Sequence, residues 1–417
     1  MPVRVRGLAL IAALVIAASS PSDAAEPVRL VTPTVYGTHL PGLGQPAADL
    51  AKRIKALSAG ALTLDLKQPG QGVQTTDILD QVSKGTVDAG FSAPSFWAGK
   101  MPAAALFAGY PFGPDARGYV DWFYAGNGRK LYQRMYDEAG YRLHVIPCAF
   151  GGGETGGWFA KEVRSPKDLE GLRMRIFGLG GRVMTRLGVA TVLVPGGAVA
   201  DAFAKQEIDA AELYPPGVDR RQNLQGTVKL IYMPGWHQPE TVLELIVNKD
   251  RWDALDDRQR AIIETACEAS LLQTLAAADE MERNALAAFT ADGVHVEQWP
   301  DAVLAALRQA WEAVAKEESD KNAFFAAVLD DLRAFTGTAR PQVRSLKLRK
   351  RARASPRRQT AASSWPFALI SRTSSRKQGC RHARPRPEYL ETRAPWANRE
   401  PSPWDRGSTC RNSRPSR

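Results

Sequence analysis

The stretch KDLEGLRMRIFGLGG (residues 167–181) gives the first indication of how this chain folds. Basic and apolar residues alternate from Arg173 to Ile176, and a period of two is typical of a β-strand. The alternation stops at Gly178, where a glycine-rich turn is expected. Such a strand places Arg173 and Arg175 on one face. Either both arginines lie on a solvated edge, or one of them binds an anion.

Strand and helix patterns alternate on both sides of this stretch. Strands are expected over 28–34, 61–67 and 87–93, and helices over 45–60 and 75–85. The strand patterns VIPCAF, GGWFAK, RMRIF, TVLVP and IDAAEL follow between short helices. This alternation predicts an α/β protein with parallel strands. With 417 residues, the chain is long enough for two domains.

Residues 252–293 have a different pattern. They contain no proline, their first glycine is Gly293, and apolar residues recur at spacings of three and four. The pattern predicts one very long helix or two abutting helices, with Asp253 or Asp256 as the N-cap. Such an element is either an ordinary packing helix or a brace that lies across two lobes.

The first 25 residues have the features of a secretory signal. Positive charge in MPVRVRG precedes the apolar run LALIAALVIAA and the small residues of SSPSDAAEP. The apolar run is too short to span a bilayer comfortably. We expect cleavage after Ala24 or Ala25 and an exported, soluble mature protein.

The net charge of +11 comes entirely from the C-terminal part of the chain. Residues 341–417 hold 20 Lys and Arg against 4 Asp and Glu, which leaves 35 basic and 40 acidic residues in the rest. This tail is rich in Arg, Ser and Pro and shows no helical or strand period, so disorder is expected. The change of composition also resembles an out-of-frame extension of a complete domain. The acidic body argues against nucleic-acid binding.

No catalytic motif is recognisable. GLGGRV (178–183) resembles a dinucleotide fingerprint, but Val183 occupies the last glycine position. There is no GxSxG elbow or HExxH pair, and the five histidines do not have the spacing of a metal pair. The sequence therefore does not predict an enzyme. Cys148 and Cys267 could form a disulfide or remain two buried thiols.

Four segments, taken in order, resemble one family. They are DILDQVSKGTVDAGFSAPSFWAGKMPA (77–103), GGGETGGWFAKEVRSPKDLEGLRMRIFGLGGRVMTRLG (151–188), AFAKQEIDAAELYPPGVD (202–219) and YMPGWHQPETVLELIVNKDRWDAL (232–255). Together they resemble the solute-binding proteins of tripartite ATP-independent periplasmic (TRAP) transporters, of the DctP type. Within that family they are most similar to the branch that binds 2-oxo and 2-hydroxy monocarboxylates, and the resemblance covers about residues 27–335.

The resemblance implies a periplasmic-binding-protein fold of type II, with two α/β lobes, hinge segments and a long helix spanning both. Lobe I would comprise 26–150 with about 240–290, and lobe II 151–239 with about 291–338. The implied function is to capture a small organic acid in the periplasm and deliver it to the TRAP permease subunits without chemical change. A receptor for a membrane sensor kinase and an exported enzyme on the same scaffold are the alternatives. Long-helix members can form homodimers.

The resemblance also implies individual roles in a cleft. Arg175 matches the arginine that holds the substrate carboxylate, whereas Arg173 is expected in a salt bridge. Glu212 and the carbonyl of Leu213 match metal ligands, and Glu154 stands where relatives carry a glutamine ligand. Gln238 is a further candidate substrate contact and Glu240 a further candidate metal ligand, and the sequence leaves open which of the two faces the cleft. An aromatic contact is expected from Phe96 or Trp97.

The charges of these residues favour a metal ion. A substrate carboxylate, Arg175, Glu154 and Glu212 together carry −2, and an unpaired buried charge is costly. A divalent ion would neutralise it, and calcium, which prefers oxygen ligands, is favoured over sodium. The rival interpretation is that Glu154 is protonated or pairs with a substrate amine. We also expect Arg175→Ala to abolish binding with thermal unfolding nearly unchanged.

Overall fold

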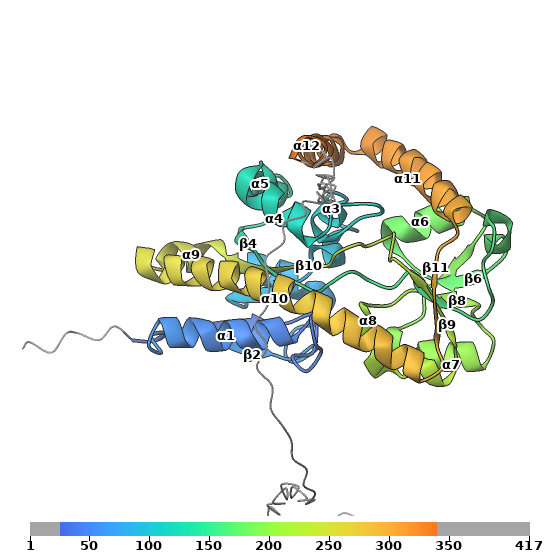
Figure 1. Cartoon of the computed structure of the whole chain (residues 1–417). Helices are drawn as coiled ribbons and strands as arrows, with labels where there is room; N and C mark the ends of the chain where they lie inside the picture. Colours follow the sequence, from blue (N-terminus) through green and yellow to red (C-terminus); the bar gives the residue numbers. More distant parts are fainter. Residues whose placement is uncertain (1–25, 340–417) are drawn as a thin grey trace, which may run out of the picture. The chain divides into compact units, whose positions relative to one another are not determined.

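The computed structural model describes residues 26–339 (Figure 1). The expected signal at 1–25 and the expected tail at 341–417 lie outside the described residues. No helix in the described range is long and apolar enough to cross a membrane. The described strands form two groups, and each group has its own helices.

The first lobe contains β1 (Val28–Pro33), β2 (Leu62–Lys67), β3 (Ala89–Ser92), β4 (Leu143–Phe150) and β10 (Val242–Asn248). Strands β1 and β2 are parallel, and α1 (Gln45–Leu57) connects them. A bridge between Thr34 and Phe91 joins this pair to the sheet β3-β10-β4. The central strand β10 is antiparallel to both neighbours, so the expectation of parallel strands fails here. The reason is that the segment leading into β10 runs back alongside the segment by which the chain leaves β4.

Four helices complete this lobe. They are α2 (Ile78–Ser83), α3 (Ala104–Ala108), α4 (Ala116–Ala125) and α5 (Gly128–Glu138). Their apolar side chains are buried in a core that includes Trp97, Phe107 and Trp122. The same core includes Phe150 at the end of β4 and Val242 at the start of β10, where the chain passes to and from the second lobe.

The second lobe has the strand order β11-β9-β5-β8-β6-β7. Its strands are β5 (Gly157–Phe159), β6 (Arg173–Arg175), β7 (Ala190–Val192), β8 (Ala210–Ala211), β9 (Leu230–Met233) and β11 (His295–Gln298). Strand β6 is parallel to β7 and β8, whereas β5 is antiparallel to its neighbours. The helices α6 (Gly178–Arg186), α7 (Val199–Ala204) and α8 (Pro216–Asp219) belong to this lobe. The expected glycine-rich turn is therefore the first turn of α6.

One long helix contacts both lobes. After the short α9 (Lys249–Ala254), α10 runs from Asp257 to Ala291, and Asp256 caps it through a capping box with Gln259. It packs on α1 and β4 of the first lobe and on α8 and β11 of the second. Figure 1 shows it crossing the molecule. The brace predicted from the sequence is thus confirmed.

A disulfide between Cys148 and Cys267 attaches α10 to β4. Both cysteines lie in the buried core between this helix and the first sheet. Of the two alternatives left open by the sequence, the structure contains the crosslink.

The last two helices separate between the lobes. Helix α11 (Asp301–Lys321) packs on α6, and Arg182 Nη2 lies 2.9 Å from Glu317 Oε2 at that contact. Helix α12 (Ala323–Ala339) packs on α3, α4 and α5, and Trp122 Nε1 donates to Asp331 at 2.7 Å. Asn322 has an extended backbone and separates the two helices. The expected assignment of 291–338 to lobe II is therefore wrong for α12.

Two segments cross between the lobes, 151–156 after β4 and 234–241 before β10. Their backbones are hydrogen-bonded to each other. Gly151 N donates to Thr241 O at 2.7 Å, Thr241 N to Gly152 O at 3.1 Å, and Glu154 N to Gln238 O at 3.1 Å. Side chains from these segments are consequently placed at the junction of the two sheets.

Candidate functional site

Four buried charged or titratable side chains meet at this junction. Glu154 comes from the first crossing segment and His237 from the second, while Arg175 ends β6 and Glu212 follows β8. Strands β6 and β8 are parallel neighbours, and Glu212 N donates to Arg175 O at 2.9 Å. The pairing of short strands therefore puts the arginine and the glutamate side by side.

The side chains form one connected network. His237 Nε2 lies 2.9 Å from Glu154 Oε2 and 3.8 Å from Glu212 Oε1. Arg175 Nη1 donates to Glu212 Oε2 at 2.9 Å and also to the Glu212 carbonyl. Gln238 Nε2 donates to Glu154 Oε1 at 2.8 Å. One ligand atom each from Glu154, Glu212 and His237 lies within 4.8 Å of the others, so these residues could hold a metal ion.

Burial and neighbouring charge set the protonation of this network. Burial, with the Glu212 charge, raises the pKa of Glu154 to about 8. Burial opposes protonation of His237, but hydrogen bonds to Glu154 and Glu212 raise its pKa to about 9. Burial alone would raise the pKa of Glu212, yet His237 and Arg175 lower it overall. At neutral pH Glu212 is therefore ionised, whereas His237 and Glu154 both favour their protonated forms.

Arg175 retains capacity to bind an anion. Its contacts to Glu212 and to Val194 O, at 3.3 Å, use Nη1 and Nε. A guanidinium has five N–H donors, so a carboxylate can still be bound through the remaining ones. The ring of Phe177 lies 4.6 Å from its Cζ. Arg173, in contrast, donates from Nε to Asp209 Oδ2 at 2.9 Å, which confirms the expected salt bridge.

Gly180, in the first turn of α6, allows the backbone to approach the site. A Cβ at this position would lie 2.8 Å from His237 Cβ, closer than real Cβ contacts allow. A larger residue would displace either α6 or His237. The glycine-rich stretch thus serves close packing against the cluster.

Two of the residues expected in the site lie elsewhere. Glu240 Oε1 accepts from Gly152 N at 2.8 Å and Thr241 N at 2.9 Å, so this carboxylate fixes the crossing backbone and is outside the cluster. Trp97 is fully buried in the first-lobe core, where its Nε1 donates to Glu244 at 2.8 Å. We therefore withdraw Glu240 as a metal ligand and Trp97 as a substrate contact.

Other expected residues keep a position compatible with binding. Phe96 is 40% exposed, and its ring packs edge-on against Tyr36 at 5.6 Å. Gln238 is tied to Glu154 as described above. The side chain of Leu213 is buried in the second-lobe core, and the role of its carbonyl stays a prediction.

Sequence reasoning missed His237 and two tyrosines. Burial and the charge of Glu154 raise the pKa of Tyr36, and burial also raises that of Tyr214, with Glu154 and Glu212 among the contributing charges. Tyr36 follows β1 and Tyr214 follows β8, so the network faces one tyrosine from each lobe. The signal available for His237 was its place in GWHQPE, within the fourth segment that carries the family resemblance.

Two lobes joined by paired crossing segments, with a buried charged cluster between them, are the architecture of a two-lobed binding protein. The chain belongs to the bacterial extracellular solute-binding proteins of family 7 (DctP), whose family model matches residues 41–322. This agrees with the resemblance noted in the sequence.

The chain is similar to characterised proteins of known ligands. It is 33% identical, over 69% of its length and 79% of the relative's, to a monocarboxylate 2-oxoacid-binding periplasmic protein of Nostoc sp.. Two solved TRAP solute-binding proteins are each 30% identical. That of Colwellia psychrerythraea, with bound calcium and pyruvate, has a TM-score of 0.71 and coverage of 76% of this chain and 96% of its own. That of Bordetella bronchiseptica, a dimer with calcium and picolinate, has a TM-score of 0.70 and coverage of 75% and 93%.

A third structure differs in its ion. The TRAP solute-binding protein of Pseudoalteromonas atlantica contains sodium and pyruvate; it is 28% identical, with a TM-score of 0.70 and coverage of 76% of this chain and 95% of its own. Relatives of this fold therefore bind the same acid with ions of different charge.

Proposed function

We propose that this chain is a periplasmic receptor of a TRAP transporter that binds a 2-oxo or 2-hydroxy monocarboxylate together with a divalent cation, calcium being favoured. The observation that carries the proposal is the buried network of Arg175, Glu154, Glu212 and His237 between the lobes. A receptor of this kind would deliver the acid to the membrane permease subunits. The relatives named above support both the acid and the ion.

Arg175 would bind the substrate carboxylate. It ends a strand at the lobe junction, its side chain is buried, and donors remain after its contact with Glu212. Charge-assisted hydrogen bonds from a guanidinium are about twice as strong as neutral ones. Its fixed position beside Glu212 would place the carboxylate next to the ion.

The donors present fit a hard cation. Glu154 and Glu212 offer carboxylate oxygens, which calcium prefers, and their ligand atoms lie within 4.8 Å of each other and of His237. A bound dication would supply two positive charges to a pocket that a substrate anion makes more negative. His237 would then orient Glu154 by hydrogen bonding, as partners of metal ligands commonly do.

The role of His237 determines which ion the site would prefer. An imidazole is an unusual calcium ligand but a common zinc ligand. If His237 remained a hydrogen-bond partner of Glu154, calcium would be preferred. If it coordinated the ion directly, zinc would be preferred.

Titration calorimetry with pyruvate tests the proposal. The purified chain is measured after chelator treatment and then with added calcium, sodium or zinc. We expect binding at least tenfold tighter with calcium than with sodium. Elemental analysis finding no ion, together with equal affinity in chelator, would contradict the metal. Absence of binding for a panel of 2-oxo and 2-hydroxy acids in every ion would contradict the substrate class.

A further inference from the structure

A line of ring contacts leads from the cluster to the surface. The ring of Trp236 meets that of His237 edge-on at 5.6 Å, and Phe112 stacks on Trp236 at 5.7 Å with 30° between the planes. The Cζ of Arg308 lies 4.1 Å from the centroid of Phe112. Phe112 lies between α3 and α4 in the first lobe, whereas Arg308 is on α11, which packs on the second lobe.

The backbone holds Phe112 in this line. Its φ is +58°, in the left-handed region that bulky residues rarely adopt. Such a conformation persists only where surrounding contacts determine it, and it is found disproportionately at functional sites. Here Phe112 N donates to Trp236 O at 2.7 Å. The ring of Phe112 and the backbone of Trp236 are therefore fixed together.

Trp236 depends on ring contacts for its orientation. It is buried, and its Nε1 has no hydrogen-bond partner among residues 26–339. A buried indole ordinarily gains direction from such a bond. Without such a bond, the ring contacts with Phe112 and His237 are what orient the indole. A change at Phe112 would therefore reach His237 through a single intervening ring.

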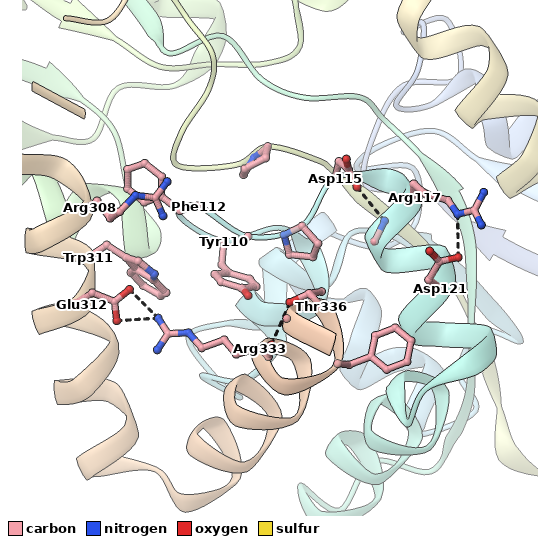
Figure 2. Close-up of a pocket in the computed structure, with 16 residues that line it drawn as sticks. Tyr110, Phe112, Asp115, Arg117, Asp121, Arg308, Trp311, Glu312, Arg333 and Thr336 are labelled. Atoms are coloured by element: carbon pink, nitrogen blue, oxygen red, sulfur yellow. Dashed lines mark hydrogen bonds and ion pairs between the residues drawn. The ribbon is translucent and has the colours of Figure 1, made fainter. Parts of the chain in front are cut away.

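Arg308 is exposed at the edge of a pocket of about 510 Å³ (Figure 2). The other two arginines of this pocket are paired, Arg117 with Asp121 at 2.8 Å and Arg333 with Glu312 at 3.0 Å. Within the described part of the chain Arg308 has no carboxylate partner, and the face of Phe112 is its contact. Guanidinium groups stack favourably on aromatic faces.

The same helix is also connected to His237 through α6. Glu317 of α11 pairs with Arg182 of α6, and Gly180 of α6 packs against His237. His237 therefore contacts both α6 and Trp236, the inner end of the line Trp236–Phe112–Arg308. Both supports end on α11, outside the cluster itself.

We propose that Phe112 and Arg308 are positioning residues for ligand binding, acting through Trp236 on His237 and hence on Glu154. Neither residue touches the charged cluster, and neither belongs to the binding motifs recognised in the sequence. This inference rests on the proposed function, because the affinity it predicts is that for the acid and its ion. Arg308, on the exposed surface of α11, would thereby contribute to ligand binding.

The test compares variants of the full chain. Arg308→Gln removes the stacked cation, and Phe112→Leu removes the ring; Phe112→Tyr keeps an aromatic face and is the conservative rescue. Arg333→Gln is the matched control, because it makes the same charge change in the same pocket away from the line. Calorimetry with pyruvate and calcium should give a dissociation constant raised about two- to fivefold by Arg308→Gln, as expected for a cation–π contact. Arg333→Gln and Phe112→Tyr should match the unchanged protein.

A second measurement needs no ligand. Hydrogen exchange of the amides in residues 235–238 should be at least twofold faster in Arg308→Gln than in Arg333→Gln. Arg308→Gln should also add nothing to Phe112→Leu, since the guanidinium then has no ring to contact. These two results separate a positioning role from a general loss of stability.

The outcomes distinguish this inference from the proposed function. If the unchanged protein binds pyruvate with calcium but Arg308→Gln and Arg333→Gln have equal affinities and equal exchange, the positioning role is overturned. If the unchanged protein binds no acid, the proposed substrate class fails, and the exchange comparison still decides whether Arg308 orders the 235–238 segment. Equal exchange in that case also overturns the inference.

Discussion

The Arg175 side chain has two roles. It neutralises the charge of Glu212, and it has N–H donors left to bind a substrate carboxylate. Arg175→Ala would leave a buried carboxylate without its partner, which typically costs about 3 kcal/mol of unfolding free energy. The earlier expectation of nearly unchanged unfolding is therefore replaced by a clear loss. Arg175→Lys keeps the charge but loses the planar fork, so we expect it to fold and to bind at least about tenfold more weakly.

Arg173→Gln is the matched control for these variants. Arg173 lies on the same strand, and its ion pair with Asp209 is largely exposed. Such pairs contribute only about 0–1 kcal/mol. Thermal unfolding and calorimetry should find this variant close to the unchanged protein. Equal loss of affinity in Arg173→Gln and Arg175→Lys would contradict the specific role of Arg175.

His237 should make the ion-free protein sensitive to pH. Its folded pKa of about 9 exceeds the ordinary value of 6.5, so the folded state binds the proton more tightly. That contribution is complete below about pH 6.5 and is lost as the pH rises through about 9. The shift corresponds to on the order of 3 kcal/mol of unfolding free energy. Thermal unfolding between pH 6 and pH 9 should show falling stability in chelator, and a flatter profile in His237→Asn.

Glu240 and Glu212 should respond differently to the same substitution. Glu240→Gln keeps an oxygen that can accept from Gly152 and Thr241, so calcium affinity should change less than about threefold. Glu212→Gln removes a charge from the cluster and should weaken calcium binding at least about tenfold. Calorimetric titration with calcium checks both. A larger effect at Glu240 would restore it as a ligand.

Residue identities in the site were only partly accessible from sequence. Arg175, Glu154 and Glu212 could be selected because each lies in a recognisable family motif. His237 also lies in a family segment, but its partners Glu154 and Glu212 are 83 and 25 positions away, and no local spacing indicates the contact. The sequence could not decide between Phe96 and Trp97, because position at a strand end does not reveal Glu244, the buried hydrogen-bond partner of Trp97.

At the scale of elements, the disulfide should matter for stability. It joins β4 to α10 across 119 residues, and both cysteines are buried. A disulfide typically stabilises a protein by about 2–4 kcal/mol. Reductant should therefore lower the midpoint of thermal unfolding, and the Cys148→Ala/Cys267→Ala variant should start lower and show no such response. An equal response in both proteins would assign the effect to other cysteines.

The sequence predicted secondary-structure elements correctly where the local residue pattern determines them. The predictions were wrong where packing between distant parts of the chain determines the outcome. The long helix and its cap at Asp256 were foreseeable from apolar spacing and an acidic residue at its start. The direction of β10 and the destination of α12 were not, because each depends on where the chain goes after leaving the other lobe. Both corrections concern connections between lobes, which local periodicity does not encode.

At the scale of the whole molecule, binding should not require residues 341–417. The charged cluster, both sheets and the supporting helices lie within residues 26–339, and the family match ends at residue 322. A variant lacking 341–417 should bind pyruvate and calcium within about twofold of the full chain, because every residue proposed to hold the acid and the ion remains in it. At a ligand concentration of 100 times the dissociation constant, both proteins should gain about 2.7 kcal/mol of stability. Thermal unfolding with and without ligand checks this, and a tenfold weaker affinity of the shortened chain would show that the basic segment contributes to the site.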